Sequence, residues 1–210
     1  RQERVGFRSW DDPTRFHRSS LSRYRNTILD RTPVTQQTND GRPVITVLDR
    51  RSPASFYSSD RTETPGGGSE WRSIPNVSSI AEALSAVGTV SIVDTATLTP
   101  AEQVDLLART DLLVAQHGAG LSNMVWMAPR SSVIEILPPL PPTIDAIFRN
   151  LAAACRLGYG QIAQEREHAA VDPEPVLQVA RALMTGPGTH IPTPTGSWPI
   201  RMVRQMPRRL

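Results

Sequence analysis

Strands and helices alternate repeatedly between residues 43 and 184, and this alternation constrains the fold more than any other feature. The strand candidates are short apolar runs rich in β-branched residues. Their alternation with helices predicts an α/β fold, namely a mostly parallel, Rossmann-like sheet with helices on both faces. The runs are unbroken, as expected of strands that are covered on both sides. The predicted strands are PVITVLD (43–49), TVSIVD (89–94), DLLVA (111–115), SVIEIL (132–137) and YGQIA (159–163).

The intervening segments carry helix start and stop signals. Ser79 and Glu82 have the spacing of a capping box. Thr99, Pro100 and Glu102 give the second helix an N-cap, a first-turn proline and a capping partner. A glycine at the end of the fourth helical segment, Gly158, is predicted to close it. The predicted helices span 79–87, 99–109, 120–127, 143–158 and 173–184.

The pattern also predicts how the chain is divided. Residues 41–185 hold the alternating elements and are predicted to form one domain. Residues 1–40 are polar and arginine-rich, with a weakly helical piece at 21–29, and are expected to be a connector at the end of a missing N-terminal half. A flexible insert is predicted at 52–70, where hydrophobic periodicity is absent and three glycines adjoin, and a proline-rich tail at 186–210.

Charge and cysteine content exclude several classes of function. The 23 basic residues give a net charge of only +3 and are interleaved with acidic residues, so nucleic acid is not an expected partner. The single cysteine, Cys155, excludes an internal disulfide and a thiolate metal cluster, and its apolar neighbours predict a buried structural thiol. No run approaches the roughly 18 apolar residues of a membrane span. A membrane contact is therefore expected only through a segment absent from this chain.

The turn after the third strand, Gln116–Gly120, is the main candidate for a functional site, because open α/β sheets bind ligands at the carboxyl ends of strands. Gly118 and Gly120 lack a Cβ, so the backbone there can approach a ligand or adopt a positive φ. The helix that follows leaves its first amides unpaired at its positive end. These features suit a phosphate, with His117 as a further donor. They equally suit a turn that only packs a strand and a helix closely together.

The same turn, with the sequence HGAG, also resembles the oxyanion turn of esterases and lipases. That chemistry needs a G-x-S-x-G elbow further along the chain, followed by an acid and a histidine. The downstream serines do not provide one, since Ser122 lies in GLSNM and Ser197 in TGSWP. An esterase is therefore disfavoured.

The run from Leu98 to Pro139 resembles the signature of glycosyltransferase family 61, which includes secretory-pathway protein O-GlcNAc transferases and plant xylosyl- and arabinosyltransferases. That signature contains E-Q-V, an apolar strand, H-G-A-G-L-[ST]-N, an apolar pair with Met, then Pro and V-[IV]-E-[IL]. So many fixed positions over some forty residues make the signal specific. The matching residues are Glu102, Gln103, Val104, His117, Gly118, Ala119, Gly120, Leu121, Ser122, Asn123, Met127, Pro129, Val133, Ile134, Glu135 and Ile136.

Weaker similarity extends the resemblance to about Pro43–Ile162. Arg50 and Arg51 follow the first strand as in the family's Ser-Arg-Arg, with Asp49 in place of the serine. Arg72 and Asn76 match the family's Arg-x-Ile-x-Asn. Arg130 departs from the pattern, since the family usually has glycine there; it either extends the phosphate site or closes the loop differently.

The resemblance implies a GT-B architecture, in which two Rossmann-like halves face each other, and residues 41–185 would be the C-terminal, nucleotide-sugar-binding half. It implies a UDP-sugar donor, inversion at the anomeric carbon, no cofactor or obligatory metal, and a glycoprotein or polysaccharide acceptor. The absence of a D-x-D pair from the sequence agrees with metal independence. The expected location is the Golgi or endoplasmic reticulum lumen, or the cytoplasm if the protein is bacterial. The alternative is a non-catalytic nucleotide-sugar-binding remnant, or a fragment that lacks the acceptor domain.

The resemblance also suggests roles for individual residues. His117 is the catalytic candidate, stabilising charge on the leaving phosphate together with nearby amides. The arginines would bind the diphosphate, and Glu135, at the mouth of the fourth strand, would accept hydrogen bonds from ribose hydroxyls. The general base is expected on the missing half, since His17, His168 and His190 lie in polar or loop sequence. The residues expected to bind the donor are Arg50, Arg51, Arg72, Gly118, Ala119, Gly120, Leu121, Ser122, Asn123 and Glu135.

Overall fold

The computed structural model describes residues 16–35, 41–49, 73–139 and 146–185. Within these ranges five strands form one fully parallel sheet in the order β2-β1-β3-β4-β5. The insert predicted at 52–70 and the tail at 186–210 lie outside the described residues. All five predicted strands are present, and the predicted α/β, Rossmann-like class is confirmed. The strands are β1 (Val44–Leu48), β2 (Thr89–Val93), β3 (Leu112–Gln116), β4 (Ser132–Leu137) and β5 (Gly158–Ala163).

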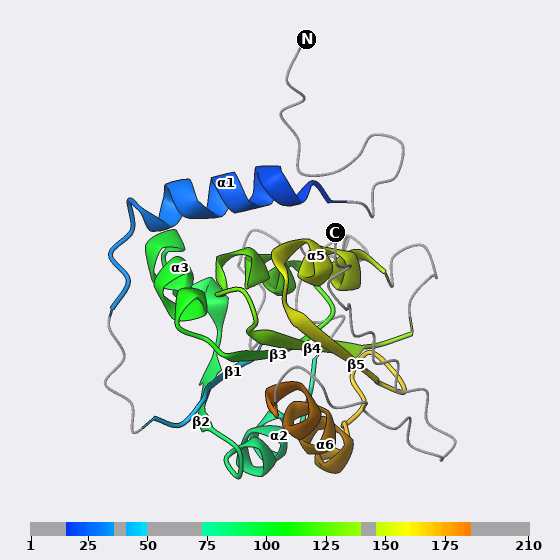
Figure 1. Cartoon of the computed structure of the whole chain (residues 1–210). Coiled ribbons are helices and arrows are strands. Elements are labelled where there is room, and N and C mark those ends of the chain that lie inside the picture. The colour runs from blue at the N-terminus through cyan, green and yellow to red at the C-terminus, as the bar shows by residue number, and fades with distance from the viewer. Residues whose placement is uncertain (1–15, 36–40, 50–72, 140–145, 186–210) are drawn as a thin grey trace, which may run out of the picture.

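Helices cover both faces of the sheet, as predicted (Figure 1). On one face lie α2 (Val77–Leu84) and α6 (Pro173–Met184). The other face carries α3 (Pro100–Ala108), the 3₁₀ helix η4 (Ala119–Trp126) and α5 (Ile147–Cys155), with α1 (Arg18–Leu29) packed against η4 and α5. A short 3₁₀ helix, η3 (Thr95–Thr97), follows β2.

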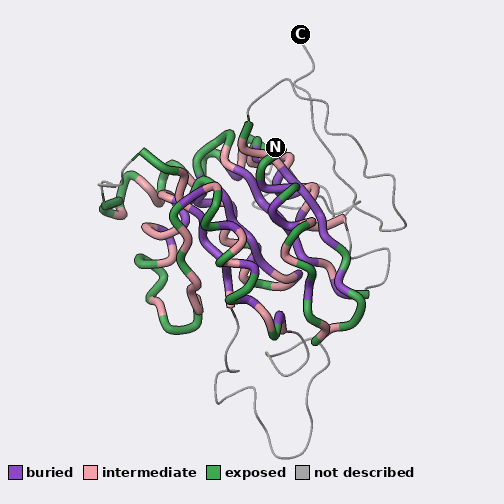
Figure 2. The backbone as a smooth tube through the Cα atoms, turned by 90° about the horizontal axis from the view of Figure 1, so that it is seen from below, coloured by how far each residue is buried: buried purple, intermediate pink, exposed green. Residues whose placement is uncertain are grey.

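Apart from the edge strand β2, the strands are buried on both sides, because alternate side chains meet different helical layers. In β3, Leu113 and Ala115 belong to the cluster under α3, η4 and α5, whereas Leu112 and Val114 belong to the cluster under α2 and α6. Figure 2 shows the resulting band of buried residues through the centre of the described chain. This two-sided burial is the physical reason for the unbroken apolar runs in the sequence.

The order of the strands fixes where a ligand can bind. β1 pairs with β2 on one side and with β3 on the other, so Ile45 lies between Val90 and Leu112. The chain thus adds β2 on one side of β1 and then returns to add β3, β4 and β5 on the other side. In doubly wound sheets, ligands bind outside the carboxyl ends of the strands at this reversal. The position to examine is therefore the end of β1 and β3.

One of the two predicted capping boxes is present. The backbone N–H of Thr99 donates to Glu102 Oε2 over 2.7 Å, and that of Glu102 donates to Thr99 Oγ1 over 3.3 Å. The hydrogen bonds from Thr99 lower the pKa of Glu102. This box starts α3 at the predicted place.

The box predicted at Ser79 and Glu82 was wrong. Helix α2 begins two residues earlier, at Val77, and its N-cap is Asn76. The Asn76 side chain caps no amide of its own helix. It donates to Val171 O over 2.8 Å and accepts from Val171 N over 2.9 Å, so it ties the start of α2 to the segment before α6.

The prediction that Gly158 closes the fourth helical segment was also wrong. Helix α5 ends at Cys155, and the next residue, Arg156, takes the left-handed conformation (φ 62°). Gly158 instead starts β5 and pairs with Ser132. A Cβ at Gly158 would lie 2.5 Å from Ser132 Oγ, so the glycine permits close approach of the strands.

Helix α1, from the predicted connector, packs on the domain. Leu21 is buried in the core, and Arg25 Nε donates to Met127 O over 3.0 Å. The ring of Tyr24 lies 5.3 Å from that of Trp126. Burial lowers the pKa of the Arg25 guanidinium. The connector role of residues 1–40 stays a prediction, but at least α1 contributes to the core.

The thiol of Cys155, which was predicted to be buried, is only partly buried. Burial raises its pKa to about 11, an effect that the nearby positive charge of Arg25 partly opposes. At neutral pH the thiol is therefore protonated and a poor nucleophile.

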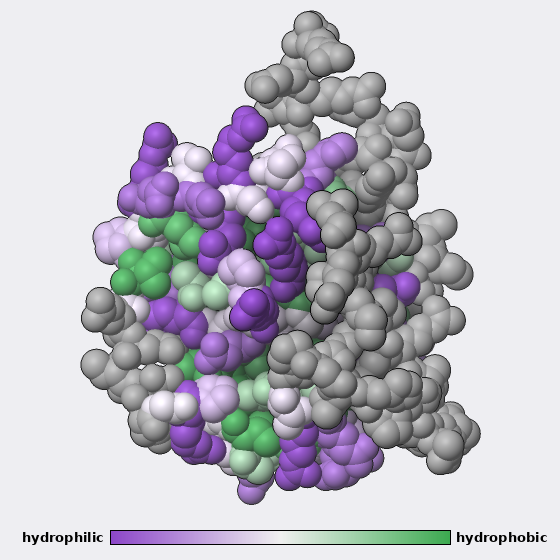
Figure 3. All heavy atoms as spheres, in the orientation of Figure 1, coloured by the Kyte–Doolittle hydropathy of each residue, from purple (hydrophilic) through white to green (hydrophobic). Residues whose placement is uncertain are grey.

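Figure 3 shows the surface of the molecule from the side seen in Figure 1. On its described part, hydrophilic side chains are mixed with small apolar areas. Among the described residues, Tyr24 and Val34 are the large hydrophobic side chains classed as exposed. None of the described helices is both long enough and apolar enough to cross a bilayer.

Candidate functional site

The turn between β3 and η4 is very short, because only His117 and Gly118 separate the strand from the helix. Gly118 is extended (φ 160°, ψ −179°), and Gly41 is the described glycine that occupies the left-handed region. Positive φ is thus not the reason for the glycines of this turn. Gly120 instead allows close packing, since a Cβ there would lie 3.2 Å from Leu48 Cδ1.

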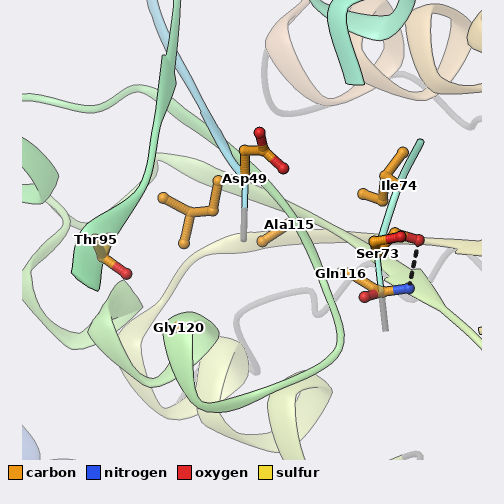
Figure 4. Close-up of a pocket in the computed structure, with 8 residues that line it drawn as sticks. Asp49, Ser73, Ile74, Thr95, Ala115, Gln116 and Gly120 are labelled. Carbon is orange, nitrogen blue, oxygen red and sulfur yellow. Dashed lines mark hydrogen bonds between the residues drawn. The ribbon is translucent and has the colours of Figure 1, made fainter. Parts of the chain in front are cut away.

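A pocket lies at the carboxyl ends of β1 and β3, where the sheet order reverses. It is a small depression that is open to solvent. In Figure 4, Asp49 stands at the end of β1, with Thr95 on one side and Ser73 and Gln116 on the other. Gly120 contributes the first turn of η4, whose N-terminal end carries a partial positive charge. The lining residues are Leu48, Asp49, Ser73, Ile74, Thr95, Ala115, Gln116 and Gly120.

The three arginines predicted to bind the diphosphate, Arg50, Arg51 and Arg72, lie outside the described residues. Their neighbours in the chain are described, and both line the pocket: Asp49 precedes Arg50, and Ser73 follows Arg72. A contact between these arginines and a ligand in the pocket stays a prediction.

His117 belongs to a buried polar network that joins three strands. Its Nδ1 forms a hydrogen bond with Glu135 Oε1, and Tyr159 donates its hydroxyl proton to Glu135 Oε2. Gln161 Nε2 in turn donates to the Tyr159 hydroxyl over 3.2 Å. The side chain of Phe148 packs edge-on against the imidazole, with ring centroids 4.9 Å apart. All four polar residues are buried.

This network changes the position expected of Glu135. The carboxylate was predicted at the mouth of the fourth strand, facing a ribose, but it is fully buried and both its oxygens are engaged by His117 and Tyr159. It lies in the layer with α5, not on the wall of the pocket. In this position Glu135 orients the His117 ring through its hydrogen bond to Nδ1.

The rest of the predicted motif divides between core, surface and structural contacts. Leu121 is buried, whereas Ala119 and Ser122 are exposed. Asn123 Nδ2 donates to Gln103 Oε1 over 2.9 Å, and Gln103 Nε2 donates to Thr95 O over 2.9 Å. Asn123 and Gln103 therefore hold η4, α3 and η3 together. A contact between these motif residues and a donor stays a prediction.

Two glutamines that sequence reasoning missed secure the other wall of the pocket. Gln116 Nε2 donates to Ser73 O over 3.1 Å (Figure 4) and to Glu167 O over 2.9 Å. Gln164 Nε2 donates to the same Ser73 carbonyl over 2.9 Å. The sequence did carry a signal for them, because each is a glutamine at the carboxyl end of an apolar strand: Gln116 ends β3, and Gln164 follows β5.

Tyr159 and Gln161 were missed as well, although the sequence carried a signal for them. They lie two residues apart in β5 and therefore point to the same face of a strand. Two polar side chains on one buried face require partners there, and those partners are Glu135 and, through it, His117.

Arg130 has a conformational explanation. It adopts a left-handed conformation (φ 81°), and its N–H donates to Arg156 O over 3.1 Å. A glycine adopts this conformation without strain, which accounts for the family's usual residue at this position. The observation favours the loop-closing alternative for Arg130.

In the part of the chain that the structure describes, no three His, Cys, Asp or Glu residues gather closely enough to hold a metal ion.

The comparisons with known proteins agree with the motif. A sequence model of the family described as Glycosyltransferase 61 matches residues 11–134, which is more than half of the chain. A search of curated proteins found no match. The matched region includes the pocket-lining residues and the turn, and it ends inside β4, just before Glu135. The predicted resemblance is confirmed, and the chain belongs to glycosyltransferase family 61.

Proposed function

We propose that this glycosyltransferase is inverting and metal-independent, and that it takes its sugar from a UDP-sugar. Residues 41–185 would form the donor-binding half of a GT-B enzyme. The observation that carries the proposal is the pocket at the reversal of strand order, with Gly120 and the start of η4 in its wall. Nucleotides bind at this position in doubly wound sheets, and helix N-termini favour phosphate.

In this proposal the diphosphate lies against the first turn of η4. A 3₁₀ helix leaves its first amides without an acceptor inside the helix, so the amides of Ala119 and Gly120 would donate to phosphate oxygens. Arg50, Arg51 and Arg72, whose chain neighbours line the pocket, would neutralise the remaining charge as planar fork donors. Fixed donors of this kind stabilise the negative charge that grows on the leaving diphosphate as the bond to the anomeric carbon breaks.

Hydroxyl groups of the donor need acceptors as well as donors. Asp49 and Thr95 line the pocket, and both suit hydroxyls, whereas a carboxylate repels a phosphate. A ribose contact of Glu135 would require the carboxylate to leave His117 and Tyr159. We therefore assign ribose or sugar hydroxyls to Asp49 and Thr95. His117 stays the catalytic candidate from the family motif, although it is buried and does not line the pocket.

We expect the chain to bind UDP more tightly than uridine. Charge-assisted hydrogen bonds contribute about 1.5–3 kcal/mol each, so even one of them makes UDP at least about tenfold tighter. Isothermal titration calorimetry in the presence of a chelator measures both affinities and removes divalent cations as a contributor. Equal affinities for the two ligands would refute a diphosphate seat, and a preference that vanishes with the chelator would refute metal independence.

The acceptor in this proposal is a hydroxyl of a glycoprotein or polysaccharide, in the lumen of the Golgi or endoplasmic reticulum. The acceptor oxygen attacks the anomeric carbon from the face opposite to the diphosphate, which inverts the configuration. Its proton passes to a general base, which we expect on the acceptor-binding half. A screen of UDP-sugars with the full-length protein, read as UDP release with and without acceptors, identifies the donor. Binding of UDP without release from any donor would favour the non-catalytic alternative.

A further inference from the structure

The hydrogen bonds around His117 have a defined direction, which begins at Gln161. Its Nε2 is a donor only, so the Tyr159 oxygen accepts from it over 3.2 Å. The Tyr159 hydroxyl must then place its own proton elsewhere, and its partner is Glu135 Oε2. Glu135 thus acts as an acceptor at Oε2. With Glu135 as a carboxylate, Oε1 can only accept as well, which assigns the proton of this contact to His117 Nδ1.

Burial makes this direction hard to reverse. Glu135 is fully buried, and His117, Tyr159 and Gln161 are each at most 5% exposed, so water is not at hand to replace a missing partner. A buried donor or acceptor without a partner is costly, and linked hydrogen bonds in a low-dielectric interior strengthen one another. Moving the His117 proton from Nδ1 to Nε2 would bring a ring lone pair against the carboxylate.

The network also has no obvious need to be polar if it serves the core alone. Its members come from β4, β5 and the turn after β3, and their surroundings include apolar residues such as Phe148 and Val133. Buried ionic groups often contribute no more stability than apolar residues of similar volume. What the polar arrangement adds is a fixed ring orientation and a fixed proton at His117, next to the turn that leads to Gly120.

We infer that Tyr159 and Gln161 are positioning residues for His117, acting through Glu135. They keep a proton on Nδ1 and so fix both the orientation of the imidazole ring and the chemical character of Nε2. Nε2 accepts a hydrogen bond when the ring is neutral and donates one when the ring is protonated. The role toward a nucleotide-sugar rests on the proposed function, whereas the position of the proton does not.

The proton is tested directly by long-range ¹⁵N–¹H correlation spectra of the imidazole rings in the unmodified chain. The four histidines are distinguished by replacing His17, His168 and His190 one at a time with glutamine. We expect the proton of the neutral His117 ring on Nδ1. A neutral His117 with its proton on Nε2 would overturn the inference, whatever the ligand.

Two variants test the link to the ligand. Tyr159→Phe removes the donor to Glu135 Oε2, and Gln161→Leu removes only the donor to Tyr159. We expect either variant to broaden or shift the His117 nitrogen signals. We also expect Tyr159→Phe to weaken UDP by about tenfold, the size of one charge-assisted hydrogen bond, with uridine affinity unchanged. Tyr24→Phe, on exposed α1, is the matched control and leaves both readouts unchanged.

The outcomes separate the two proposals. If the unmodified chain binds UDP no more tightly than uridine, the proposed diphosphate site is refuted. The nitrogen spectra of His117 then still test the positioning role. The positioning role would be refuted if neither Tyr159→Phe nor Gln161→Leu changed the UDP preference or the His117 nitrogen signals. The network would then be structural only. If Tyr159→Phe does not fold, the Gln161→Leu chain carries the same comparison.

Discussion

Replacing Glu135 with alanine should lower the free energy of unfolding by about 3–5 kcal/mol, the cost of removing one member of a buried, hydrogen-bonded polar pair. The fully buried carboxylate is the common acceptor for His117 Nδ1–H and the Tyr159 hydroxyl. Alanine removes the acceptor that these two buried donors share and creates a cavity beside them. Each of these effects costs free energy by itself.

Urea denaturation measures this change, with two controls. Glu82→Ala removes an exposed glutamate from α2 and should change stability by no more than about 0.5 kcal/mol. Glu135→Gln keeps one acceptor oxygen and the side-chain volume, so its loss should lie between the two alanine variants. A Glu135→Ala loss as small as that of Glu82→Ala would show that the network does not hold His117.

Replacing Gly160 with alanine should cost about 1–3 kcal/mol, the usual penalty for overfilling a packed interior. Gly160 lies in β5 directly under α6, and a Cβ there would come within 2.4 Å of Val179 Cγ1. Val179 is fully buried, so its side chain has no solvent space into which to move. The helix would have to shift away from the sheet.

A double-mutant cycle shows whether this contact is the cause. Val179→Ala alone should cost about 2 kcal/mol for the lost apolar burial. In the chain that carries both Gly160→Ala and Val179→Ala, the methyl group added to β5 occupies part of the space that the valine side chain vacated. The two losses should then be non-additive by about 1 kcal/mol or more. Losses that add to within about 0.5 kcal/mol would place the strain elsewhere.

The sequence was a good guide to the fold because the apolar runs and the helix signals are local. Each strand was identified from a run such as TVSIV, and α3 from the Thr99 capping box, since both depend on neighbouring residues. The errors at α2 and α5 have a different origin. Asn76 uses its side chain to bind Val171, and Arg156 takes the left-handed position ahead of Gly158. Both depend on tertiary contacts that lie far away in the chain.

The candidate site shows the same contrast between local features, which were predicted, and tertiary contacts, which were not. The turn was located correctly at the carboxyl end of the third strand, because that depends only on the order of the elements. The surroundings of His117 could not be foreseen. Its partners Glu135 and Tyr159 come from β4 and β5, and only the register of the sheet brings them together. That register also buries Glu135, which the sequence placed at the mouth of its strand.

The central claim is that the diphosphate of a UDP-sugar binds at the carboxyl ends of β1 and β3, against the start of η4. Its most direct test is a titration of ¹⁵N-labelled chain with UDP, followed by backbone amide shifts. The account predicts that Ala119, Gly120, Asp49 and Thr95 shift most, and that uridine leaves the first two unmoved. Large UDP-dependent shifts confined to other parts of the chain, with Ala119 and Gly120 unchanged, would contradict it.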